Sequence, residues 1–316
     1  MKLPNFLVIG APKCGTTSLH HYLSQHPEVY VPQRKELHYF SYAYMQRFAA
    51  GPGDAYVLAP LCATRQAYEK HYERVGRQRA VGDISPSYLY YAEVSERIKA
   101  ELGKPKIVVV LRDPIDKAFS QYMHLVRDNR ERLTFYDALM AEEQRIREGW
   151  AALWRYAESS LYADKLKHYL DVFGIDHVKI LLFEDLTRDP QLVMRELFDF
   201  LCVDQHFCPD TSKIHNKSGQ PRSKKLATFL AQPNVVTTVA KSLVPESIRT
   251  PIRVALLSLN TGAKGQIDNK SRAYLREFFA ADVSQIETIL GKKLAWLQRA
   301  ETCRVDMQVK RVVNSP

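Results

Sequence analysis

The sequence contains few cysteines, and their spacing is irregular. Five occur among 316 residues: Cys14, Cys62, Cys202, Cys208 and Cys303. This number excludes a small disulfide-dense scaffold, and no CxxC pair or Cys/His cluster has the spacing of a zinc site. We therefore expect free thiols in a reducing compartment. The alternative, for a secreted protein, is a disulfide between Cys202 and Cys208, which are close in the sequence.

Long hydrophobic runs, internal repeats and low-complexity linkers are also lacking. No apolar run approaches the roughly 20 residues that a membrane-spanning helix needs. The apolar stretch 6–12 is too short for the core of a signal peptide. We expect no membrane span, a cytoplasmic location and one domain over residues 1–316. Its core motifs are expected in 5–225 and a helical C-terminal portion in 226–300.

What the chain does have is a globular composition with an excess of positive charge. Hydrophobic residues make up 46% of the sequence and charged residues 25%, as in ordinary proteins with a packed core. Lysine and arginine number 45 against 35 aspartate and glutamate, so the formal net charge is +10. This excess favours an anionic partner, such as a nucleotide, a phosphorylated or sulfated ligand, a nucleic acid or an acidic surface.

Apolar runs alternate with amphipathic segments along the chain. Strands are predicted at 5–10, 29–31, 80–83, 106–111 and 178–183. Helices are predicted at 16–25, 93–102, 114–128, 134–147 and 160–172, and then at 190–202, 222–231, 245–258 and 270–290. The alternation predicts an α/β protein with a P-loop-like three-layer fold, in which helices flank a central parallel sheet and the C-terminal portion is helical.

A glycine-containing loop joins the first predicted strand to the first predicted helix. Residues 10–17 read GAPKCGTT. Glycines let the backbone turn tightly, and the start of a helix presents unpaired N–H groups to an anion. The glycines have the Walker A spacing, but Thr16 stands at the Walker lysine position and Lys13 lies inside the loop. We expect a phosphate site here, to which Thr16, Thr17 and Ser18 add hydroxyl donors.

A second candidate phosphate site follows the strand at 106–111. Arg112 stands at its carboxyl end, where open α/β sheets bind their ligands, and a guanidinium can donate two parallel hydrogen bonds to a phosphate. Ser120 lies two turns into the next helix and is expected to face the same ligand. The alternative is that Arg112 and Asp113 only cap this helix and that Ser120 is an ordinary helix residue.

Together these segments resemble the sulfotransferases that use 3′-phosphoadenosine 5′-phosphosulfate (PAPS), above all their bacterial and heparan sulfate branches. The resemblance implies PAPS as the donor, 3′-phosphoadenosine 5′-phosphate (PAP) as the product, and no metal. The cofactor-binding residues that it implies are Lys13, Cys14, Gly15, Thr16, Thr17 and Ser18 at the 5′ end, and Arg112 and Ser120 at the 3′-phosphate. A basic loop with Ser218, Gly219 and Arg222 resembles the family's loop that closes over the nucleotide, the alternative being a solvated loop.

The segment 33–40 resembles the Lys-Glu-x-His-x-Phe sequence of the heparan sulfate enzymes. This likeness implies that Glu36 is the general base and that His38 orients the acceptor or shares the proton. Lys13 would stabilise the leaving phosphate. Either Glu36 or His38 could be the principal base.

Four further residues are candidates for the acceptor pocket: Tyr39, Phe40, Ser85 and Tyr88. The alternative is that the aromatic rings belong to the core and that the segment with Ser85 packs under the site. Ile84 stands where the heparan sulfate enzymes have a lysine, which argues against a heavily sulfated polysaccharide as the acceptor.

The predicted activity is therefore sulfuryl transfer to a hydroxyl or amine of a carbohydrate, lipid or natural product. One alternative is a P-loop kinase or NTPase, for which Asp113 is a candidate magnesium ligand. Another is a basic, non-catalytic protein that binds nucleotides or nucleic acid. Because the positive charge is scattered along the sequence, we expect no nucleic-acid partner.

Overall fold

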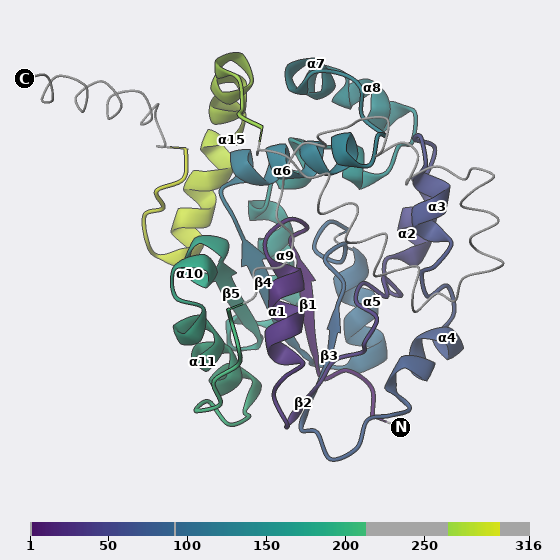
Figure 1. Ribbon diagram of the computed structural model, residues 1–316, viewed down its shortest axis with the longest axis vertical. Coiled ribbons are helices and arrows are strands. Elements are labelled where there is room, and N and C mark those ends of the chain that lie inside the picture. The colour runs from purple at the N-terminus through teal and green to yellow at the C-terminus, as the bar shows by residue number, and fades with distance from the viewer. Residues whose placement is uncertain (1, 92, 213–264, 298–316) are drawn as a thin grey trace, which may run out of the picture.

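A parallel β-sheet crosses the middle of the molecule (Figure 1). The computed structural model describes residues 2–91, 93–212 and 265–297. Within these residues five strands pair in the order β2-β3-β1-β4-β5. They are β1 (Phe6–Gly10), β2 (Val29–Tyr30), β3 (Ala80–Ile84), β4 (Lys106–Leu111) and β5 (Val178–Leu182). Each of these pairings is parallel, which confirms the predicted fold class.

The strands are almost completely buried because helices cover both faces of the sheet. All residues of β1 and β3 are buried, as are the last five of β4. Apolar runs without alternation are typical of such strands. Gly82 of β3 lies opposite Phe6 of β1, and a Cβ at this glycine would come within 2.2 Å of the Phe6 ring. The close packing of these two strands therefore requires glycine at position 82.

The helices that connect the strands divide between the two faces. Helices α1 (Thr16–Leu23) and α11 (Pro190–Leu201) lie in front of the sheet in Figure 1. Helices α5 (Glu93–Leu102) and α9 (Ala163–Phe173) pack against each other behind it. Right-handed crossover connections produce this arrangement, because the chain changes direction along the sheet after β2.

Helix α6 (Pro114–Arg127) follows β4 and runs across one end of the sheet (Figure 1). Asp113 caps it by accepting a hydrogen bond from the backbone N–H of Ile115, and Pro114 occupies the first helical position. The C-terminal helix α15 (Asn269–Leu290) contacts α6 and α9. The predicted helix at 270–290 is thus confirmed, whereas those predicted at 222–231 and 245–258 lie outside the described residues.

Several short helices differ from the expected pattern. The helix expected at 134–147 is two, α7 (Phe135–Met140) and α8 (Glu142–Arg147), which meet at Ala141. Four were not predicted: α2 (Tyr42–Arg47), α3 (Asp54–Leu58), α4 (Arg65–Glu69) and α10 (Phe183–Arg188). Short 3₁₀ helices complete the structure: η1 (Lys70–Tyr72), η2 (Ala152–Trp154), η3 (Glu158–Ser160) and η4 (Ile175–His177).

The described residues contain four cysteines, Cys14, Cys62, Cys202 and Cys208, and all four are free thiols. The pair Cys202 and Cys208 therefore forms no disulfide in this structure. Among the helices of the described segments, none is both long and apolar enough to cross a membrane.

Candidate active site

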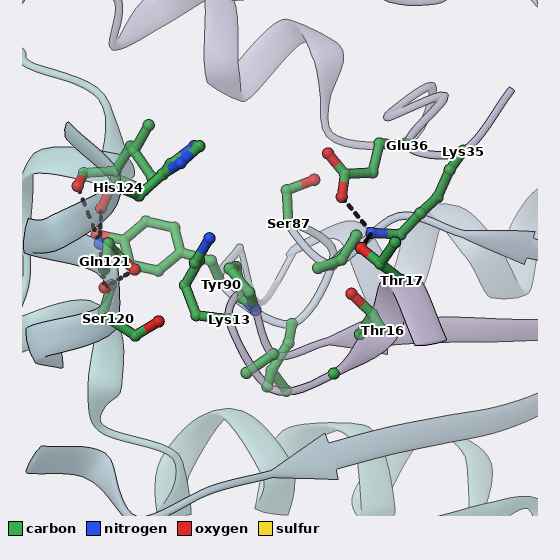
Figure 2. Close-up of a pocket in the computed structure, with 18 of the residues that line it drawn as sticks. Lys13, Thr16, Thr17, Lys35, Glu36, Ser87, Tyr90, Ser120, Gln121 and His124 are labelled. Carbon is green, nitrogen blue, oxygen red and sulfur yellow. Dashed lines mark hydrogen bonds and ion pairs between the residues drawn. The ribbon is translucent and has the colours of Figure 1, made fainter. Parts of the chain in front are cut away.

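A cavity of about 700 Å³ lies at the carboxyl ends of the strands, the place where open α/β sheets bind ligands. Its wall is formed by the loop after β1, the segment after β2, the loop after β3, helix α6 and helix α10. In Figure 2, Glu36, Lys35 and Thr17 lie on one side and Ser120, Gln121 and His124 on the other. Lys13 projects between these two groups.

The loop between β1 and α1 bends sharply to form part of this wall. Lys13 has a φ of 67° and Gly15 a φ of 84°, both in the left-handed region that favours glycine. A Cβ at Gly15 would lie 3.0 Å from the Phe183 ring. No side chain caps the first turn of α1, so its N–H groups are available to a ligand. Thr16, Thr17 and Ser18 line the cavity at this turn.

Lys13 carries an unpaired ammonium in this loop. No hydrogen bond or ion pair joins its Nζ to another residue in the described part of the chain. Burial, followed by the nearby Arg127 guanidinium, lowers the pKa of Lys13 to about 8. The group is therefore still mostly cationic at neutral pH, and an anion placed beside it would be stabilised.

Arg112 lies against the same loop although it is 99 residues away in the sequence. Its side chain is buried, its Nη1 donates a 3.1 Å hydrogen bond to the Lys13 carbonyl, and its guanidinium stacks 4.7 Å from the centre of the Phe183 ring. The Nε atom is buried without a partner. The Arg112 Nη2 lies 3.7 Å from Asp116 Oδ2, so the charge is partly compensated, but Arg112 lines the cavity and its guanidinium can still donate to a phosphate oxygen. Ser120 is also buried and lines the same cavity as Arg112.

Glu36 and His38 lie on the segment after β2, in a conformation that turns both side chains toward the cavity. Their φ angles are 65° and 54°. The Lys35 Nζ donates to Glu36 Oε1 at 2.5 Å and to Thr17 Oγ1 at 3.0 Å, and His38 Nε2 is 3.8 Å from Glu36 Oε2. Burial alone would raise the pKa of Glu36, but the His38 imidazole and the Lys35 ammonium together hold it well below its usual value. Glu36 is therefore ionised, as a general base must be, although the low pKa makes this carboxylate a weaker proton acceptor than a free one.

A buried carboxylate supports this segment from below. Asp83 of β3 accepts hydrogen bonds from Ser85 at 2.7 Å, Tyr88 at 2.7 Å and Tyr68 at 2.9 Å. Ser85 Oγ in turn accepts a 3.0 Å hydrogen bond from the backbone N–H of His38. Asp83 and Ser85 therefore fix the backbone at His38 and do not themselves line the cavity.

Ser87 holds the His38 ring from the other side. His38 Nδ1 and Ser87 Oγ are 2.6 Å apart, and Ser41 Oγ is 2.6 Å from Ser87 Oγ. Because Nδ1 is engaged, the Nε2 of His38 faces Glu36. No motif in the sequence marks Ser87 or Asp83, although both lie within a few residues of Ile84, the position where the heparan sulfate enzymes have a lysine.

The structure corrects the expected positions of the acceptor-pocket candidates. Tyr39, Phe40, Ser85 and Tyr88 are all buried and do not belong to the cavity wall. The rings of Tyr39, Phe40 and Tyr88 pack with Tyr68 in an aromatic cluster below the site. The prediction that these four side chains line the acceptor pocket is therefore wrong, because the segment turns them into the core.

Cys14 also lies behind the cavity rather than in its wall. The side chain is fully buried, its thiol is 3.9 Å from the Tyr162 hydroxyl, and its backbone N–H bonds to the Ala11 carbonyl. Burial raises the pKa of this thiol to about 11. Cys14 thus supports the loop by packing, while Ser218, Gly219 and Arg222 lie outside the described residues.

Helix α6 contributes a row of polar residues that the sequence did not single out. Gln121, His124 and Arg127 line the cavity together with Ser120. Burial and the nearby Lys13 lower the pKa of His124 to about 3, so its ring is neutral. Gln121 is fixed by hydrogen bonds to the carbonyls of Ala152 and Leu153.

The kinase or NTPase alternative requires an acidic magnesium ligand. Asp113, the candidate for this role, is occupied as the cap of α6 and does not line the cavity. Over the described segments, no group of three or more His, Cys, Asp or Glu residues could hold a metal ion.

A model of the sulfotransferase family matches residues 4–206, and the chain therefore belongs to this family. A crystal structure of a sulfotransferase from Alicyclobacillus acidocaldarius is 36% identical, has a TM-score of 0.75 and covers 95% of this chain and 100% of its own.

Two more distant proteins extend the comparison. The heparan sulfate glucosamine 3-O-sulfotransferase 3B1 of Mus musculus is 25% identical over 77% of this chain and 60% of its own length. A mouse sulfotransferase complexed with PAP is 14% identical, with a TM-score of 0.50 over 92% of this chain and 89% of its own, and so shares the fold alone. The chain spans between 23% and 64% of the length of three curated relatives that it matches.

Proposed function

We propose that this protein is a PAPS-dependent sulfotransferase that acts on a hydroxyl or amine of a carbohydrate, lipid or natural-product acceptor. The observation that carries the proposal is the meeting of Lys13 and Arg112 at one cavity, with the Arg112 guanidinium bonded to the Lys13 carbonyl at 3.1 Å. Membership of the sulfotransferase family supports it.

Two cationic groups and a helix start fit the two phosphates of the donor. The first-turn N–H groups of α1, with Thr16 and Thr17, would hold the 5′-phosphosulfate. The Arg112 guanidinium and the Ser120 hydroxyl, both in the cavity wall, would hold the 3′-phosphate. When bound, PAPS supplies a sulfuryl group whose S–O bond to the 5′-phosphate breaks as the bond to the acceptor oxygen or nitrogen forms.

The chain's own residues account for the charge and the proton that this transfer moves. Lys13 would neutralise the negative charge that develops on the leaving phosphate. Glu36, ionised and facing the cavity, would accept the proton of the acceptor. His38 would orient the acceptor or share this proton, since its Nε2 is 3.8 Å from Glu36.

Calorimetric binding of PAP, AMP and ATP tests the proposal. We expect PAP to bind roughly 10- to 100-fold more tightly than AMP, because each charge-assisted hydrogen bond contributes about 1.5–3 kcal/mol. Arg112→Ala should abolish this preference, whereas Arg147→Ala, on an exposed side chain of α8, should leave it intact.

Two outcomes would overturn the proposal. One is equal affinity for PAP and AMP, and the other is a preference for PAP that survives Arg112→Ala. Tight binding of ATP that requires magnesium would instead favour a kinase or NTPase.

A further inference from the structure

The cavity wall is apolar on the side that lies away from Lys13. Helices α2 and α3 and the segment around η2 present an apolar surface, which we call the apolar wall. It consists of Met45, Phe48, Val57, Leu58, Ala152 and Leu153. In Figure 1, α2 and α3 lie on the opposite side of α1 from α10, the helix whose Phe183 packs on Arg112. The α2 and α3 part of the apolar wall therefore lies away from Phe183 and α10, whereas Ala152 and Leu153 adjoin α6 through Gln121.

The cations nearest to the apolar wall are already paired. Arg130 forms a buried ion pair with Asp54, and Asp54 also accepts from the Trp154 indole N–H at 3.0 Å. Arg127 donates to Asp128 at 3.0 Å and contacts His124 Nδ1 at 2.6 Å. A cation whose charge is already compensated offers little to a sulfated acceptor.

Lys165 is satisfied in the same way. Its Nζ donates to the carbonyls of Glu158 and Leu161 at 3.0 and 3.1 Å and lies over the Tyr90 ring. The Tyr90 hydroxyl is itself bound by Glu158 and Arg155. This part of the cavity thus combines paired charges with apolar side chains, which is typical of sites that bind largely apolar molecules.

The apolar wall also reaches the surface. Val57 lines the cavity and is 40% exposed, and its neighbour Tyr56 on α3 is 75% exposed. Val57 and Tyr56 therefore offer hydrocarbon and aromatic surface to a molecule at this edge of the cavity. The Glu36 carboxylate, whose side chain is 46% exposed, lines the same cavity, so a molecule that lies on the apolar wall can present one end to it.

From this arrangement we infer that the acceptor is an amphiphilic alcohol or phenol: an apolar hydrocarbon or aromatic body with a hydroxyl at one end. The inference rests on the proposed function and names its substrate class. The hydroxyl bonds to the transferred sulfur and gives its proton to Glu36, while the body packs on the apolar wall.

A series of primary alcohols tests the inference. Initial rates of transfer from PAPS labelled with radioactive sulfur are measured for ethanol, butanol, hexanol and octanol, and for a sulfated heparin hexasaccharide. We expect kcat/KM to rise roughly two- to fourfold per added methylene, since burying a CH₂ contributes about 0.8 kcal/mol. A flat series, or a hexasaccharide that is a better acceptor than octanol, would overturn the inference.

A variant of the apolar wall sharpens this test. Leu58→Asp should reduce kcat/KM for octanol at least about tenfold and leave PAP affinity unchanged. Leu192→Asp, at an exposed leucine of α11 outside the cavity wall, is the matched control and should change neither. An octanol rate that survives Leu58→Asp would contradict the role of the apolar wall.

The same measurements separate this inference from the proposed function. If PAP fails to bind the wild-type protein, the proposed function is wrong. If PAP binds but the rate is independent of chain length, only the acceptor class is wrong.

Discussion

The two halves of the cavity are built in different ways. The half around Lys13 and Arg112 consists of loops at the carboxyl ends of β1 and β4, which are neighbouring strands of the sheet. The half around the apolar wall consists of α2, α3 and η2, all of six residues or fewer. The first half is fixed by the sheet, whereas the second depends on packing between short segments.

Glu36 lies between the two halves, and its replacement should separate chemistry from binding. Glu36→Gln keeps the size of the side chain but removes the carboxylate that is proposed to accept the proton. We expect kcat to fall roughly 10²- to 10⁴-fold while the calorimetric affinity for PAP stays within about twofold. Glu143→Gln, at an exposed residue of α8, is the control.

His38→Ala distinguishes the two candidate bases. If Glu36 is the principal base, the loss in His38→Ala is smaller than the loss in Glu36→Gln. The reverse order would assign the proton to His38 and place Glu36 in a supporting role.

The charge of Lys13, in the half of the cavity that also contains Arg112, should make kcat/KM depend on pH. Burial lowers the pKa of Lys13 to about 8, so the ammonium is present below this pH and is lost above it. We expect kcat/KM to fall up to about tenfold per pH unit above pH 8, because the neutral amine no longer stabilises the leaving phosphate.

Lys13→Arg provides the matched comparison, since arginine stays charged throughout this range. The alkaline fall should disappear in this variant, even if its overall rate is lower. A fall that persists unchanged would show that another group is responsible.

The smallest effect on kcat is expected for a substitution of Ser85, which is buried beneath the cavity. Ser85→Ala removes the hydroxyl that joins Asp83 to the backbone N–H of His38. Losing such a hydrogen bond costs about 0.5–1.5 kcal/mol, so kcat should fall about 2- to 10-fold with PAP affinity unchanged. Ser284→Ala, on the exposed face of α15, is the control, and an equal kcat in both variants would exclude a positioning role for Ser85.

The sequence predicted the first half of the cavity better than the second. β4 has the predicted bounds, and the other strands differ by one or two residues at most, because apolar runs buried on both faces leave a strong signal. Lys13 and Arg112 were found because each follows such a strand. Their meeting at one cavity follows from the strand order, which places β4 beside β1.

The second half could not be predicted in the same way. Helices α2 and α3 have six and five residues, which is too short for a periodic pattern, and tertiary contacts such as the pair Arg130–Asp54 fix their positions. The directions of the Tyr39 and Phe40 side chains could not be predicted from the sequence either. Their proximity to Glu36 in the sequence suggested a pocket wall, but only the left-handed turns at Glu36 and His38 decide which side chains face inward.

The sheet order has a practical consequence for engineering. Residues 42–58 form a contiguous stretch between β2 and β3, whereas the strand pairing of β1 with β4 does not involve them. An exchange within this stretch leaves the register between those two central strands unchanged, but it must keep the buried Asp54, which pairs with Arg130 and accepts hydrogen bonds from Ala151 and Trp154. Redesign of this side of the cavity is therefore best planned around that carboxylate.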